Sequence, residues 1–268
     1  MQDSNITFSG KAVVVIYDGS WLGLLTSIFD IYEKKWDVTA LIRQSDAVQK
    51  DVFAMEVTVT TDLQKAMRVW KGLRNKIPSE SAAHLYQSYL SEMPGMELAI
   101  LACIRFYFSK VENPHLAYGN PDVLKIAQTA KMVHREKHRM EAFVRFQRTS
   151  EDLYYAGIEP DFNVLPLISN HFKNRYADQS WLIYDIKRKY GIYYDLNQVE
   201  EVTLDLTDEK KSHQKIQSVF HDSETLYQEL WLNYFKNVNI PERRNIKVHL
   251  QHVPKRYWKH LIEKKISG

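Results

Sequence analysis

Cations and aromatic side chains are interleaved from His171 to Asp195, in the stretch HFKNRYADQSWLIYDIKRKYGIYYD. Cations can bind phosphates and aromatic faces can stack on bases, so this composition is compatible with a nucleic-acid surface. The aromatics also suit the core of a sheet, because both alternating faces of Trp181–Ile186 are partly apolar. We therefore expect Trp181 and Tyr184 to be core residues. The cations that we expect to contact nucleic acid are Lys173, Arg175, Lys187 and Arg188.

Three segments have an excess of Lys and Arg. Residues 131–148, 171–190 and 241–268 have net charges of +4, +3 and +6, whereas the whole chain is only +3, so the remainder carries −10. This separation indicates an anionic partner on one face, although runs of charge also mark faces that are merely solvated. The further nucleic-acid-binding candidates in these segments are Arg145, Arg148, Arg243, Arg244, Arg256, Tyr257 and Trp258.

The motifs of common enzyme and metal sites are missing from the sequence. There is no glycine-rich phosphate loop, G-x-S-x-G elbow or zinc helix, and one cysteine cannot hold an iron–sulfur cluster. His134 and His138 share a helix face, but they lack an evident third ligand and lie among cations. We therefore predict no metal and no cofactor, and no catalytic residue can be assigned. If the protein is an enzyme, Asp161, Asp178 or Asp185 could act as a general base near His171.

Length and composition describe a globular protein. The 268 residues are 44% hydrophobic, enough for a core, and the single cysteine, Cys103, lies in an apolar run where we expect it to be buried. The first residues lack the features of a secretory signal, and no apolar run approaches the roughly 20 residues that span a bilayer. We expect a cytoplasmic protein with no membrane partner.

The first half of the chain predicts a strand and then mainly helices. A buried strand at 12–17 precedes a helix that Ser20 can cap, and a second strand at 54–61 precedes a helix that Asp62 can cap. Further helices are predicted after Pro78, over 96–111 and over 122–139.

The middle of the chain predicts two hairpins, at 142–158 and 180–195, on either side of a helix over 164–176 with Pro166 in its first turn. The fold class is therefore α+β. We expect an antiparallel sheet with a β-β-α-β-β core, surrounded by N-terminal and C-terminal helices. The chain would form a single unit of residues 1–268, with possible subdivision into 1–140, 141–206 and basic helices over 220–268. The best linker candidate is Asp205–Lys215.

Several phrases also resemble a known family: YDGSWLGLL, HRMEAFVRF, YYAGIEPDFNVLPLISNHFKNRYADQSWLIYD, YGIYYD and VPKRYW. They are similar to a bacterial family described as a probable DNA metabolism protein. Its members are typically encoded beside a radical-SAM protein of DNA modification or repair, and a related domain is fused to a uracil-DNA glycosylase-like domain. The resemblance implies a DNA-related context and a radical-SAM partner, and it supplies no catalytic residue.

Together these observations favour an accessory nucleic-acid-binding protein of a DNA repair or modification system. It would bind DNA of undetermined strandedness and act beside a radical-SAM enzyme. Two alternatives stay open, an enzyme that acts on nucleic acid itself and a protein adaptor that does not bind DNA.

Overall fold

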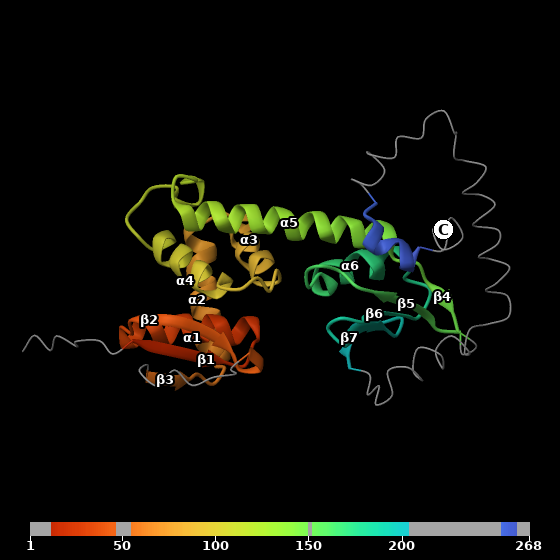
Figure 1. The fold of residues 1–268 in the computed structure, drawn as a ribbon, viewed down its shortest axis with the longest axis horizontal. Helices are drawn as coiled ribbons and strands as arrows, with labels where there is room; N and C mark the ends of the chain where they lie inside the picture. Colours follow the sequence, from red (N-terminus) through yellow and green to blue (C-terminus); the bar gives the residue numbers. More distant parts are fainter. Residues whose placement is uncertain (1–11, 47–54, 150–151, 204–252, 262–268) are drawn as a thin grey trace, which may run out of the picture. The chain divides into compact units, whose positions relative to one another are not determined.

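The computed structural model describes residues 12–46, 55–149, 152–203 and 253–261 (Figure 1). The chain divides into two compact units, unit 1 over Met1–Val133 and unit 2 over His134–Gly268. The division falls within the helix α5, Pro121–Phe143.

Unit 1 contains a three-stranded parallel sheet and several helices. Its elements in chain order are β1 (Val13–Tyr17), α1 (Trp21–Lys34), β2 (Val38–Arg43), η1 (Gln44–Asp46), β3 (Met55–Thr58), α2 (Leu63–Lys76), α3 (Ser79–Tyr89), α4 (Met96–Tyr107), η2 (Pro114–Leu116) and the start of α5. The strand order is β2-β1-β3, and both neighbours of β1 pair with it in parallel. The central strand VVVIY is nearly all buried, as its β-branched composition predicts.

Two predicted caps fix the starts of helices in unit 1. The Ser20 side chain accepts a hydrogen bond from the Gly23 N–H at 2.9 Å, and Asp62 accepts from the Gln64 and Lys65 N–H groups at 2.8 and 3.1 Å. Each cap satisfies backbone donors that the first helical turn leaves unpaired. Cys103 is buried, as expected, and burial raises the pKa of its thiol to about 12.

Unit 2 contains a five-stranded sheet and the helix α6. Its elements are the end of α5, β4 (Gln147–Arg148), β5 (Tyr154–Ile158), α6 (Leu165–Arg175), β6 (Trp181–Asp185), β7 (Tyr190–Tyr194), β8 (Val199–Val202) and η4 (Lys255–His260). The strand order is β4-β5-β6-β7-β8. The fold is thus α+β, as predicted, with the expected sequence of strands and helix in the middle of the chain.

The prediction of an antiparallel sheet was wrong. The strands β5 and β6 pair in parallel, from Tyr154 opposite Trp181 to Ile158 opposite Asp185, so the sheet of unit 2 is mixed. The cause is α6, which runs between these strands and carries the chain back to the edge at which β5 began. The hairpin β6–β7 and the pair β7–β8 are antiparallel. The first predicted hairpin is short, because α5 continues to Phe143.

The core of unit 2 is aromatic. Trp181 is fully buried and Tyr184 is 3% exposed, so both are core residues, as expected. Phe146 and Phe172 contact Trp181, each with ring centroids 6.2 Å apart, and they join the sheet to α6. Such offset and edge-on arrangements are favourable for aromatic pairs.

Some predicted segments lie outside the described residues, namely the linker candidate Asp205–Lys215 and most of the C-terminal region 220–268. Among the described helices, none is long and apolar enough to cross a membrane.

Candidate nucleic-acid interface

A buried carboxylate, Glu136, lies at the centre of the polar contacts in unit 2. Its side chain is 1% exposed, and Oε1 accepts hydrogen bonds from the Tyr257 hydroxyl and from the Asp161 N–H, the latter at 2.9 Å. Its other oxygen, Oε2, lies 3.3 Å from an Arg139 nitrogen and 3.6 Å from an Arg256 nitrogen. A buried carboxylate without such partners would be very unfavourable, so these contacts hold several chain segments together.

The Tyr257 contact fixes the segment 253–261 against the end of α5. Tyr257 is 2% exposed, and its ring lies 5.7 Å from that of Phe143. Burial raises the pKa of the Tyr257 phenol, and the neighbouring Glu136 carboxylate raises it further, so the hydroxyl stays protonated and donates. The cations of this short segment are thereby brought next to those of α5.

A second ion pair, Asp185 with Arg188, lies at the turn between β6 and β7. Asp185 is fully buried, and one of its oxygens lies 2.9 Å from the Arg188 guanidinium. Arg188 also donates to the carbonyl oxygens of Pro160 at 3.1 Å and Asp161 at 3.2 Å. Burial raises the pKa of Asp185 above its ordinary value of 3.8, and Arg188 only partly offsets this. This arginine therefore joins the β6–β7 turn to the loop that follows β5.

In the described part of the chain, cations of the three basic segments contact either the loop 159–161 or the neighbouring Glu136. Arg188 reaches it from the second segment, while Arg256 from the third lies 2.6 Å from the Asp161 carboxylate. Lys259, also from the third, forms an ion pair with Glu159. Arg139, from the first, meets Arg256 at the Glu136 carboxylate. The cations thus come together around carboxylates, a charge balance that composition alone does not reveal.

The other predicted residues have varied surroundings. Arg148 pairs with Asp152 at 2.7 Å, Arg145 donates to the carbonyl oxygens of Ala142 and Val144, and Lys173 donates to the Asn197 carbonyl at 2.7 Å.

Arg175 lies over the Tyr176 ring at 5.8 Å, and Lys187 is exposed in the β6–β7 turn. The indole N–H of Trp258 donates to the Val253 carbonyl at 3.1 Å. Arg243 and Arg244 lie outside the described residues.

Sequence reasoning missed Glu136 and a second carboxylate on α5, Glu141. The Glu141 side chain is 12% exposed and lies 2.8 Å from Lys137, 3.2 Å from His138 and 3.7 Å from His171. His171 therefore has Glu141 beside it rather than any of the aspartates proposed for a catalytic pair. Within the described residues, no group of three or more His, Cys, Asp or Glu side chains is arranged to hold a metal ion. The sequence signal that could have identified the Glu141 contacts is the spacing of His138 and Glu141, which lie one helical turn apart.

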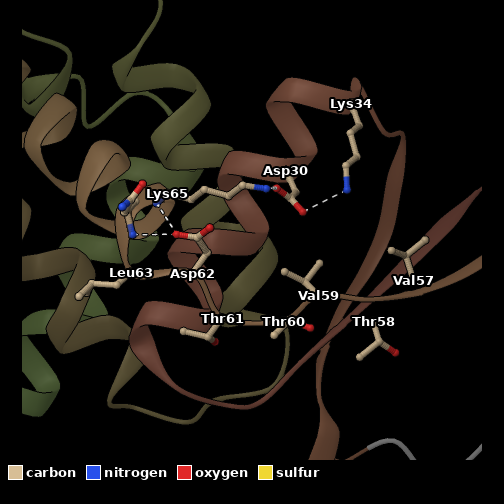
Figure 2. A pocket seen from close by; sticks show the side chains of 11 residues that line it. Asp30, Lys34, Val57, Thr58, Val59, Thr60, Thr61, Asp62, Leu63 and Lys65 are labelled. Atoms are coloured by element: carbon tan, nitrogen blue, oxygen red, sulfur yellow. Dashed lines mark hydrogen bonds and ion pairs between the residues drawn. The ribbon is translucent and has the colours of Figure 1, made fainter.

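A cavity of about 770 Å³ is in unit 1 beside β3 and the start of α2 (Figure 2). There Asp30 lies between Lys34 and Lys65, with oxygen–nitrogen distances of 3.2 and 2.7 Å, and Asp62 caps α2. Because these charged groups pair with one another and with the helix, they do not select a ligand of either charge.

These features define a two-unit α+β protein whose second unit gathers cations around buried acids. A family model described as a domain of unknown function, DUF4130, matches residues 94–263, and the chain belongs to this family. The match includes all the described residues of unit 2. It includes none of the helices α1–α3 of unit 1. A comparison with curated proteins found no match.

Proposed function

We propose that this protein is an accessory nucleic-acid-binding protein of a DNA repair or modification system. The observation that supports this is the meeting of Arg139 and Arg256 at one buried carboxylate, Glu136. A guanidinium has five N–H donors, and Glu136 lies within ion-pair distance of one nitrogen of each arginine. The two side chains remain 28% and 43% exposed, so their outward edges can donate to a phosphate.

Other exposed cations lie close to these two arginines in the sequence. Arg135 on α5 and Lys255 in η4 are exposed, and neither forms an ion pair with the described residues. Asp161 competes with a phosphate for Arg256, since its carboxylate lies 2.6 Å away and is 47% exposed. The proposal therefore implies binding that depends on several weak phosphate contacts and is sensitive to salt.

The DNA repair context and the radical-SAM partner rest on the resemblance of the sequence to the DNA metabolism family. An accessory role fits a chain whose single cysteine cannot ligate a cluster on its own. The partner would supply the radical chemistry, and this protein would hold the nucleic acid.

The test is a salt titration of fluorescent single- and double-stranded DNA, followed by anisotropy. The variant Arg135→Ala/Lys255→Ala removes two exposed cations and leaves the contacts of Glu136 intact. It should bind all sequences more weakly, and each lost phosphate contact should flatten the log–log salt slope by about 0.9 on duplex or about 0.7 on single strands.

The matched control is Lys71→Ala/Arg74→Ala, which removes two exposed cations from α2 in unit 1. It should bind DNA like the wild type. Absence of binding at low salt would overturn the proposal and favour the adaptor, as would equal affinity of the wild type and the unit 2 variant.

A further inference from the structure

A cavity of about 380 Å³ lies between α6 and the strands β7 and β8 in unit 2. This is within the usual size range of small-ligand pockets. Its apolar side includes Pro166, Ile192 and Val199, together with the ring of Tyr190, whose hydroxyl is bound to Asn163. The flat apolar ring of a ligand would pack against these side chains.

The polar groups come from both sides of this cavity. From α6 come Ser169, Asn170 and Lys173, and from β8 comes Glu201. Glu201 is directly opposite Ile192 in the β7–β8 ladder, so the two side chains share the sheet face that α6 covers. Asn170 and Glu201 are exposed, and neither side chain forms a hydrogen bond or an ion pair with the described residues.

The charges favour a neutral ligand. Lys173 and Glu201 have opposite signs, and Glu200 adds a further negative charge at the rim. The carboxylates oppose a phosphate, while Lys173 opposes a cation. What remains favourable is an uncharged ring that donates N–H groups to Glu201 and offers an acceptor to Asn170 or Lys173.

We propose that this pocket binds a nucleobase, and guanine in preference to the other bases. Guanine presents two donors, N1–H and the N2 amino group, beside the acceptor O6, which matches a carboxylate beside amide and ammonium donors. Thymine and uracil place acceptors on both sides of their single N–H, and one of these would face the carboxylate. The inference rests on the proposed function, since the base would come from an unpaired or extruded nucleotide.

The test is a calorimetric titration of the full chain with guanosine, adenosine, cytidine and thymidine. Guanosine should bind most tightly. The variant Glu201→Gln should weaken guanosine binding by about 10- to 100-fold, as expected for the loss of a bidentate base contact. The matched control is Asp178→Asn, because Asp178 is an exposed carboxylate of unit 2 that does not line this cavity. It should bind guanosine like the wild type.

Equal binding of the four nucleosides would overturn the proposal, as would no binding of any, or an unchanged affinity in Glu201→Gln. The unfolding midpoint of each variant shows whether it is folded. Salt-dependent DNA binding without guanosine binding would overturn the assignment of guanine to this pocket and would still support the proposed function. Guanosine binding without DNA binding would support the guanine site and overturn the proposed function.

Discussion

Each unit contains a buried aspartate in an ion pair, and the pKa values of the two aspartates are shifted in opposite directions. In unit 1, the Asp30 side chain is 9% exposed and lies between Lys34 and Lys65. In unit 2, Asp185 is fully buried and forms an ion pair with Arg188. The pKa of Asp30 is lowered and that of Asp185 is raised.

The difference shows that an ion pair does not by itself determine how a carboxylate titrates. Burial raises the pKa at both sites, and at Asp30 the hydrogen bonds and charges of two lysines outweigh it. At Asp185 complete burial outweighs one arginine, even with the backbone N–H of Arg188 donating at 3.0 Å. The number of cations and the remaining access to water together decide the direction.

The two sites therefore give opposite dependences of stability on pH. Asp30 stabilises unit 1 above its ordinary pKa of 3.8, and this contribution is lost as the pH falls through its lowered folded pKa. Asp185 has a raised folded pKa, so its contribution is most favourable below 3.8 and declines as the pH rises through that folded pKa.

The largest effect that we predict comes from Arg188→Met. This change leaves Asp185 buried without its cation, and it also removes donors from the carbonyl groups of Pro160 and Asp161. The free energy of unfolding of unit 2 should fall by about 3–5 kcal/mol. Denaturant unfolding, with hydrogen exchange of unit 2 peptides, measures the loss. It should be smaller in acid, where Asp185 is protonated.

The control for Arg188→Met is the double variant Asp185→Leu/Arg188→Met. It removes both charges, so it should be more stable than the single variant. If the single variant were as stable as the double one, the uncompensated charge of Asp185 would not be the cause of the lost stability. The contrast drawn between Asp185 and Asp30 would then be wrong.

Much of the fold was predictable from local patterns. Ser20 and Asp62 mark helix starts, and the alternation in Trp181–Ile186 indicates a strand of the second hairpin, because caps and strand periodicity depend on neighbouring residues. The strand β2, Val38–Arg43, was missed although its composition is typical of a strand. The parallel pairing of β5 with β6 was also missed, yet a helix between two strands is the usual sign of it.

The site was less predictable than the fold. Composition located the cations but not their partners, because Tyr257 and Glu136 are 121 positions apart in sequence. Which arginine meets which acid depends on how α5, the 159–161 loop and η4 pack together. A charge count treats Arg188 and Lys187 alike, whereas one is in a buried ion pair and the other is exposed.

An effect of intermediate size is predicted for Tyr257→Phe, which tests the contacts of the buried Glu136. Loss of one hydrogen bond to a charged group should lower the free energy of unfolding by about 1.5–3 kcal/mol. The control is Tyr193→Phe, since the Tyr193 hydroxyl makes no hydrogen bond with the described residues. The measurement is the midpoint of thermal unfolding of the two variants. Equal midpoints for both variants would contradict the role given to the Tyr257 hydroxyl.

The smallest effect on stability is predicted for Lys65→Met in unit 1. Lys65 is partly exposed, Lys34 remains beside Asp30, and exposed ion pairs contribute little, so the unfolding midpoint should change less than in either unit 2 variant. The informative quantity is the pKa of Asp30, which NMR of its carboxyl carbon measures. It should rise in Lys65→Met, and rise further in Lys34→Met/Lys65→Met, because burial is then unopposed and Asp30 becomes like Asp185. An Asp30 pKa that stays low in the double variant would mean that the lysines do not cause the difference between the two units.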